Sequence, residues 1–580
     1  MVGTPWIIEG TIDPRWPINT RGNIGEVFPE VLTALGYELG VLPAEQAWRD
    51  AYDDLGILAK GDFSSDDPVI IGLYGGYAYL NLSYLRMMGV RAPGSSAEAI
   101  DVSFFGEGNP PPYVPRKGDK SIGSSLRIVR TVLSALGTSE LPPVAADSDT
   151  RTAAFEARRP ALDTASDREL LDYLYALPKG FGPVFGNHMK TTALAAIVSG
   201  VLADACAAAG EPGLVTHLIG AAGEVRSAQY SQALYELAKI ANESTAVTAT
   251  LDHAEGANLD TALDSLRSQD DASAFVAGFD AFITEHGHRG PNDWELSSRT
   301  WDNTPSLALL ALDRMRGAQH DLAPSTRLGD DDAKRQAAIA KIRPQLNFLD
   351  KANFDKAVKA VPFWAQARES TRDRAVRYLM PAKQVFRELV RRAAERGGDP
   401  DPVTVALLYP RTELPTYLDD PSSMAEVLVE RRALFDRFSA VEPPFFIVDQ
   451  SEVPTIEELE ANQTARSSVV EAGTVLTGSA GSSGTAIGKA RVVLDPSEAI
   501  DLEPGEVLVA PLTDPSWTPL FLPAAAVVVN VGALMSHAVI VARELAIPCV
   551  VAVEDATSKI TTGMTVEVDG TAGTVKILET

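Results

Sequence analysis

Apolar residues recur at intervals of three and four positions along residues 124–440, for example at 231–243. This spacing predicts long amphipathic helices, because it gathers the apolar side chains on one helical face. The part before about residue 123 is different. Aromatic and glycine-rich stretches such as 69–85 alternate there with proline-rich loops such as 106–120, a pattern that predicts strands and turns with few long helices.

The last hundred residues change pattern again. One amphipathic helix is expected at 536–546, and a Gly- and Ser-rich stretch at 477–488 has the composition of a flexible connector. Short β-branched runs predict strands at 489–494, 506–512, 525–530 and 548–553, with a final pair within 564–578.

The expected fold is therefore α+β and multidomain. A large, mainly helical domain is expected over 1–465, irregular and β-containing to about residue 123. A hinge linker is expected at 466–485, and a small β/β/α domain at 486–580. A mobile C-terminal unit follows from the connector.

Composition narrows the function classes. Lys and Arg number 51 against 78 Asp and Glu, a net charge of −27, which disfavours nucleic acid and anionic membrane surfaces as partners. Two cysteines exclude a disulfide framework and a four-thiolate metal site. The first residues lack the features of a secretory signal. The apolar stretch 191–210 carries Asp204, so we expect a buried helix there and not a membrane span. A cytoplasmic protein is expected.

His537 follows an apolar strand and a glycine-containing turn, and it falls in the first turn of the expected helix. Ser536 is placed to cap this helix, whose free N–H groups and dipole favour an anion such as phosphate. The same field disfavours protonation of the imidazole and keeps a ring nitrogen nucleophilic. The alternative is a histidine that caps a helix for structural reasons alone.

The C-terminal segments resemble the swivelling phosphohistidine domain of the phosphoenolpyruvate (PEP)-utilising enzymes, in order and spacing. This resemblance implies that His537 is phosphorylated. Ala533 departs from the pattern, because the family commonly has a second glycine there. The matching segments are 478–493, 508–521, 532–551 and 566–578.

The preceding domain resembles the substrate domain of rifampin phosphotransferase and its PEP-synthase-like relatives. The matching segments are 19–33, 74–81, 285–301 and 367–374. The loop 285–301 holds His286, His288, Arg289 and Trp294 between glycines and a proline, and it suits a small-molecule pocket. Arg289 would hold phosphoryl oxygens, and His288 or His286 would take a hydroxyl proton. The alternative is that these residues bind carboxylates and carbonyls between helices.

Arg368 and Arg372 lie four residues apart, hence on one face of a predicted helix, and could converge on a phosphoryl group. Glu369 would fix or counterbalance one of them. Surface ion pairs are the alternative. Tyr74, Tyr77 and Tyr79 would line one face of a strand, either as core packing or as the wall of a pocket for a ring-bearing substrate.

The sequence opens directly on the acceptor-type domain, and too few residues follow His537 for a PEP- or pyruvate-binding barrel. We therefore expect a subunit of a two-component phosphotransferase. A separate ATP-grasp subunit, holding ATP and Mg²⁺, would phosphorylate His537, and this chain would bind no cofactor tightly and no metal. It would pass the group to a small alcohol or phenol, as the split phenylphosphate and alkylphenol (cresol) phosphate synthases that it resembles do.

Two alternatives stay open. One is an antibiotic phosphotransferase with a rifamycin-like acceptor, because the resemblance of the first domain points to that family. The other is a non-catalytic phosphocarrier that receives phosphate on His537 and signals through a partner. A carrier would need only the last hundred residues.

Overall fold

A computed structural model gives the structure of the 580-residue chain. It describes residues 10–63, 67–105, 110–220, 226–253, 259–316, 324–466, 470–494, 502–513, 517–521, 523–532, 536–545 and 547–580.

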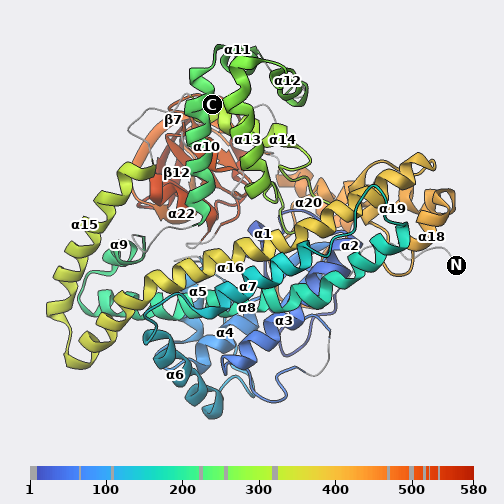
Figure 1. The fold of residues 1–580 in the computed structure, drawn as a ribbon. Coiled ribbons are helices and arrows are strands. Elements are labelled where there is room, and N and C mark those ends of the chain that lie inside the picture. Colours follow the sequence, from blue (N-terminus) through green and yellow to red (C-terminus); the bar gives the residue numbers. More distant parts are fainter. Residues whose placement is uncertain are drawn as a thin grey trace.

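Two long helices, α8 (Asp167–Ala208) and α16 (Phe348–Glu395), run side by side through the middle of the molecule (Figure 1). Ser166 starts α8 with a capping box, in which its hydroxyl accepts from the Glu169 amide. The two helices approach closely at Gly180, where an added methyl group would lie 1.9 Å from the Tyr378 hydroxyl. Long helices over 124–440 were predicted, and they form the frame of the large part that precedes the C-terminal unit.

Further helices pack around this frame. A peripheral group has its own core around Trp364 and Cys206. A separate lobe forms around Phe275 and Phe279. The frame and peripheral helices are α6 (Ile122–Leu136), α7 (Pro143–Glu156), α9 (Val215–Gly220) and α15 (Pro324–Ile342); the lobe comprises α10 (Arg226–Glu243), α11 (Thr245–His253), α12 (Leu259–Leu266), α13 (Ser273–His286) and α14 (Pro305–Arg316); the chain then continues through α17 (Pro402–Ala406), α18 (Leu414–Asp419), α19 (Ala425–Ser439) and α20 (Ile456–Arg466).

The N-terminal part contains the expected strands, joined into a four-stranded sheet of order β2-β3-β1-β4. Gly75 and Gly76, both with positive φ, turn the β2–β3 hairpin. Tyr74 therefore pairs with Tyr77 across the hairpin, which corrects the expectation of one tyrosine face along a single strand. The strands are β1 (Asn19–Thr20), β2 (Ile71–Tyr74), β3 (Tyr77–Asn81) and β4 (Phe446–Ile447).

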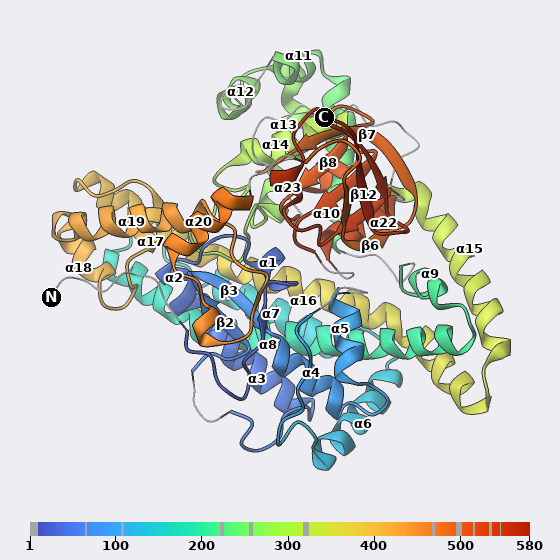
Figure 2. The ribbon, with the colours of Figure 1, turned by 180° about the vertical axis from the view of Figure 1, so that it is seen from behind.

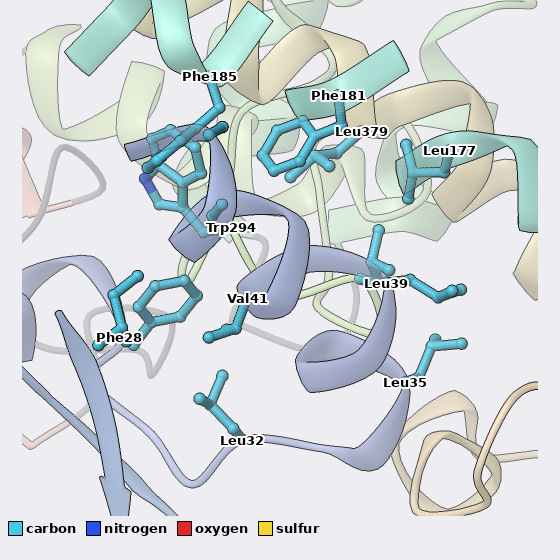
Figure 3. Packing of buried hydrophobic residues seen from close by; sticks show 14 of the residues in the cluster. Phe28, Leu32, Leu35, Leu39, Val41, Leu177, Phe181, Phe185, Trp294 and Leu379 are labelled. Atoms are coloured by element: carbon cyan, nitrogen blue, oxygen red, sulfur yellow. The ribbon is translucent and has the colours of Figure 1, made fainter. Parts of the chain in front are cut away.

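This part is more helical than its composition predicted. A continuous helix runs from Ala34 to Asp54 through a π-helical turn at Tyr37–Val41, and further helices follow the sheet. Leu35, Leu39 and Val41 face Phe181 and Leu177 of α8 across the main core (Figure 3). Burial of these side chains outweighs local propensity. The helices are α1 (Ile24–Val27), α2 (Ala34–Gly36), α3 (Leu42–Asp54), α4 (Leu82–Arg91) and α5 (Ala97–Phe105).

The C-terminal residues fold into a separate β-rich unit, which we call the carrier unit (residues 470–580). Its eight strands follow the order β5-β12-β11-β7-β8-β9-β10-β6, and apolar side chains cover both faces, as two cores around Phe521 and Ile577. The strands are β5 (Val475–Thr477), β6 (Ser479–Ser482), β7 (Thr485–Val492), β8 (Val507–Ala510), β9 (Ala526–Val529), β10 (Cys549–Val551), β11 (Thr565–Asp569) and β12 (Thr574–Glu579); the helices are α21 (Thr518–Phe521), α22 (His537–Leu545) and α23 (Ala556–Lys559).

The stretch expected to be a connector, 477–488, lies inside this sheet. β6 pairs antiparallel with β10, and Gly478 donates to the Gly573 carbonyl at 2.8 Å. Val470 and Gly473 also donate to carbonyls of the unit. A hinge at 466–485 is therefore wrong for most of that range; the unit begins by Val470, and 467–469 lie outside the described residues. Small residues here allow close strand contact.

The helix expected at 191–210 forms the C-terminal half of α8. By length and composition, α8 is the one described helix that could cross a membrane. Val198, Leu202 and Cys206 of this half are fully buried against the peripheral core. α8 also contacts α16, and 33% of its most apolar window is buried inside the structure.

Candidate active site

His537 begins α22 (His537–Leu545), the first helix that the structure describes after β9. Ser536 occupies the N-cap: its hydroxyl accepts from the Val539 amide at 3.4 Å, and its carbonyl from the Ile540 amide at 3.0 Å. Residues 533–535, including Ala533, lie outside the described residues. The capped helix start directs free N–H groups toward the position of the histidine, which suits an anion.

The imidazole of His537 is oriented by its own unit. Its Nδ1 lies 3.2 Å from the Thr513 hydroxyl, and the ring of Phe521 meets it edge-on at 5.9 Å. Burial, together with the charges of Arg372 and Arg289, lowers the pKa of His537 to about 3. The ring is therefore neutral at pH 7, with an unprotonated nitrogen for nucleophilic attack.

The carrier unit docks this histidine on the helical part of the chain. The His537 amide donates to Glu26 Oε2 at 3.1 Å, a contact between residues 511 positions apart. Ser479 makes a second link, because its hydroxyl donates to the Phe105 carbonyl at 3.1 Å. Figure 2 shows the carrier unit against the N-terminal elements and the α10–α14 lobe. The histidine thus faces side chains from both ends of the chain.

His288 is hydrogen-bonded to Asp373, with 2.9 Å between Nε2 and Oδ1. Burial pushes the pKa of Asp373 upward, but the bond from His288 and the charges of Arg289 and Arg374 outweigh it and hold that pKa below its usual range. The carboxylate therefore stays ionised and favours the His288 tautomer with a proton on Nε2. A base held by a carboxylate in this way is common in acid–base catalysis.

Arg289, buried beside His288, keeps its charge. Burial lowers the pKa of Arg289, but Asp293, Tyr230 and Asp373 together raise it above its ordinary value. Its Nη1 lies 3.2 Å from Asp293 Oδ2, and its guanidinium lies 5.6 Å from the centroid of the Tyr230 ring. The cation is fixed in place, and its charge lowers the pKa of His537.

Arg368 and Arg372 share one face of α16, as predicted, and both lower the pKa of His188, after burial as the larger cause, to about 3. Glu369 pairs with Arg368 at 3.4 Å, which fits the predicted counterion. Arg372 forms no hydrogen bond or ion pair with the residues that the structure describes. Its charge acts on His188 and on His537, so it lies between α8 and the carrier unit.

Trp294 is buried and stacks on His188, with 6.2 Å between ring centroids and a 26° angle between planes. Phe185 meets both rings edge-on. The indole Nε1 has no hydrogen-bond partner among the described residues. This aromatic wall lies on the same side of α16 as the arginine pair.

Buried polar side chains hold the loop after α13 in place. Lys383 donates to the Asp293 carbonyl at 3.0 Å and to the Ser298 hydroxyl at 2.8 Å. Burial and the charge of Arg387 lower the pKa of Lys383 to about 7. Glu295, also buried, accepts from the Thr33 hydroxyl at 2.8 Å. These contacts hold Arg289 and Trp294 in position.

The other predicted residues lie further out. His286 ends α13 with its ring 5.0 Å from Phe282, and burial lowers its pKa. Tyr77 donates to the Phe438 and Val441 carbonyls at 2.7 and 3.0 Å. Tyr77 also lines a cavity of about 1960 Å³.

This cavity lies between the two parts of the chain. Arg21, Phe105 and Asn292 line one side, and Leu512 and Val531 of the carrier unit line the other. His537 itself is not among the lining residues, but Leu512 directly precedes Thr513, which contacts its ring. The cavity therefore reaches the residue next to Thr513.

Four residues of the site escaped the sequence analysis: Glu26, His188, Asp373 and Thr513. Glu26 and Asp373 fall inside the stretches 19–33 and 367–374 that carried the resemblance, so that signal was present. His188 sits in a long helix whose pattern shows only packing. Nothing local marks it.

Two family models match parts of the chain. Residues 187–374 match the rifampicin phosphotransferase fourth domain, and residues 502–573 match the mobile domain of PEP-utilising enzymes. The first match contains His288, Arg289 and Arg372, and the second contains His537. Over these two ranges the chain is similar to the PEP-utilising enzymes.

The chain is also similar to curated proteins. The prodigiosin synthesizing transferase PigC of Serratia marcescens is 27% identical over all of this chain and 65% of its own length. A rifampicin phosphotransferase of Streptomyces sviceus is 29% identical over 56% of this chain and 37% of its own. The chain thus spans less than two thirds of these relatives. The matched domains and the name of the Streptomyces sviceus relative support a phosphotransferase.

Proposed function

We propose that the chain carries a phosphoryl group on His537 and transfers it to the hydroxyl group of a small, phenolic acceptor. The influence of the Arg289 and Arg372 charges on the buried ring of His537 carries this proposal, because a neutral nucleophile then lies in the field of two cations. Transfer of a phosphoryl group needs alignment and charge neutralisation more than covalent help. A histidine with a purely structural role would not need two neighbouring arginines.

In the transfer step, the acceptor oxygen attacks phosphorus while the bond from phosphorus to Nε2 of His537 breaks. The electron pair of that bond returns to the imidazole, and Thr513 holds the other ring nitrogen. His288 takes the proton of the acceptor hydroxyl, because Asp373 directs its protonated nitrogen away. Arg289 and Arg372 neutralise the phosphoryl oxygens.

A ring-bearing acceptor fits the aromatic side chains nearby. Trp294, His188 and Phe185 form a wall beside Arg372, and the cavity gives a route between the two parts of the chain. A phenol or alkylphenol such as a cresol needs only one base, since its hydroxyl is already fairly acidic.

We further propose that a separate ATP-grasp subunit loads His537, in the cytoplasm. ATP and Mg²⁺ bound to that subunit would supply the phosphoryl group and neutralise its charge during loading. His537 must leave Glu26 to reach them, which calls for motion of the carrier unit.

The decisive experiment combines the purified chain, the ATP-grasp subunit, Mg²⁺ and ATP labelled in the β-phosphoryl group. We expect acid-labile label on His537 and formation of AMP, and neither with His537→Asn. His286→Asn is the matched control, because His286 packs outside the cluster and should leave labelling unchanged. Labelled His537→Asn protein would refute the phosphohistidine.

Acceptors are then compared. Phenol, a cresol, a rifamycin and an aliphatic alcohol are added to the labelled chain, and release of label into product is followed. Fastest transfer to the phenols is expected. Transfer to the rifamycin alone would favour the antibiotic phosphotransferase instead, and a chain that discharges to no acceptor would point to a phosphocarrier.

A second candidate comes from one observation: the prodigiosin synthesizing transferase is matched over the whole chain, whereas the rifampicin phosphotransferase is matched over about half. The chain would then act in the synthesis of a small molecule, and phosphorylation would activate one building block. In this case the phosphorylated acceptor would be consumed when a second building block is added to the same assay. A stable phosphate ester would speak against it.

A further inference from the structure

Helix α6 packs on the frame with only one side. Ile128, Ala135 and Leu136 are buried against it. Polar side chains add bonds on the same side: the Thr131 hydroxyl donates to the Leu55 carbonyl at 2.9 Å, and the Ser125 hydroxyl to the Arg91 carbonyl at 2.8 Å. These contacts fix which face of α6 points outward.

The outward face is apolar. Ile122, Leu126, Val129 and Leu133 expose 83%, 68%, 39% and 58% of their surface, although each is a residue that proteins usually cover. Their spacing of four, three and four residues is the d-a-d-a seam of a coiled coil. A seam of this kind accepts another helix, because the knobs of one helix fill the holes of the other.

The surroundings of the seam are basic in a chain that is strongly acidic overall. Arg130 follows the seam residue Val129 and takes the flanking e position, which sets partner choice in coiled coils. Residues 115–136 contain five basic residues and a single acidic one, Asp119. Asp119 is buried and accepts from the Tyr113 hydroxyl at 2.7 Å. The exposed charge of this segment is therefore positive, although Arg127 is partly balanced by the exposed Asp53 of α3, 3.6 Å away.

We propose that α6 is a docking helix for a partner protein, which presents an amphipathic helix with acidic residues beside its apolar seam. A second copy of this chain fits less well, because antiparallel α6 helices would oppose Arg130 to Arg130. A lipid surface also fits less well. Its helices carry aromatic side chains on the apolar face, and this seam has none.

The position of α6 is compatible with catalysis. In both views α6 lies on the far side of α8 and α16 from the carrier unit (Figures 1 and 2). A partner on this face leaves the path of His537 open. The proposal is therefore independent of the phosphotransfer proposed above.

The test uses two synthetic helical peptides of three heptads, with leucine at a and d and either glutamate or lysine at e and g. Binding to the full chain is followed by fluorescence anisotropy. The glutamate peptide should bind about five- to tenfold more tightly than the lysine peptide. Arg130→Glu should reverse this preference.

Leu126→Glu should weaken binding of the glutamate peptide by about tenfold or more, because it places a charge in the seam. Val429→Glu is the matched control: Val429 exposes 71% of its surface on α19 and should have no effect. Circular dichroism checks that each variant is folded.

Four results would overturn the proposal. They are equal binding of both peptides, no binding of either, self-association that Leu126→Glu abolishes, and binding of α6 to vesicles of anionic lipid in preference to the glutamate peptide. These outcomes distinguish a partner protein from a second copy of the chain and from a membrane surface.

Discussion

The charge on Asp373 determines which nitrogen of His288 carries the proton. Replacing Asp373 with Asn preserves shape but removes the charge, so the other tautomer becomes equally favourable. We expect the transfer rate to fall about 10²-fold or more, with acceptor affinity nearly unchanged. Single-turnover release of phosphoryl from His537 to a phenol measures this effect.

Asp149→Asn is the control for that variant, since Asp149 pairs with the neighbouring Arg374 on the outer side of α16. Its rate should stay within about twofold of the original. Equal losses in both variants would show that Asp373 serves the fold and not the proton transfer.

Arg372 and Arg368 have different surroundings although they share one helix face. Arg368 is paired with Glu369, whereas the charge of Arg372 is directed at two neutral histidines. Arg372→Ala should lower the transfer rate about 10²- to 10³-fold, and Arg368→Ala much less. A larger loss in Arg368→Ala would reverse the assignment of the phosphoryl clamp.

At the scale of single residues, the sequence predicted the features that depend only on neighbours in the chain. His537 and its cap Ser536 are neighbours, so a helix start between an apolar strand and an apolar helix predicts both. The partners of His288 and His537 could not be predicted this way. Asp373 and Glu26 come from parts of the chain 85 and 511 residues away, and only folding brings them to the histidines.

Two glycines of α8 should respond in opposite ways to replacement by alanine. At Gly180 a methyl group would collide with the Tyr378 hydroxyl of α16, whereas at Gly200 nothing lies within 4 Å. Gly180→Ala should therefore reduce the free energy of unfolding by about 1–3 kcal/mol. Gly200→Ala should increase it by about 0.5–1 kcal/mol, because alanine favours helix.

Urea unfolding followed by circular dichroism measures both changes, and the sign of the difference is the result that matters. Destabilisation by Gly200→Ala would contradict the exposure of that position. A neutral Gly180→Ala would mean that α8 and α16 can separate slightly at no cost.

The long helices and the strands of the carrier unit were predicted well, because their apolar periods of about four and two persist over many residues. The stretch 477–488 was predicted wrongly. Glycine and serine are typical of linkers, but here small residues let β6 approach β10 and the turn at Gly570, where an added methyl group would lie 1.9 Å from the Ser482 carbonyl. Composition alone cannot separate these two uses of glycine.

Docking of the carrier unit should depend on pH. The pKa of His537 is about 3 when docked, against an ordinary value of 6.5 when the ring is in water. The docked state therefore binds fewer protons below pH 6.5, so acid favours release. Each pH unit in the window from about 6 to 4 should weaken docking up to about tenfold.

Small-angle X-ray scattering can follow this release as an increase in the radius of gyration. His537→Asn cannot take up the proton, and its radius should change much less over the same window. Equal expansion of both proteins would assign the acid effect to other groups, such as His188, whose pKa is also about 3.

The sheet of the carrier unit is covered by its own side chains on both faces. Leaving the helical part therefore exposes little apolar surface, and the unit carries all the packing it needs to persist alone. The unit that bears His537 can then be regarded as a detachable module. Residues 470–580 supplied as a separate polypeptide should restore transfer by a His537→Ala chain, at a rate that rises with the concentration of the added module.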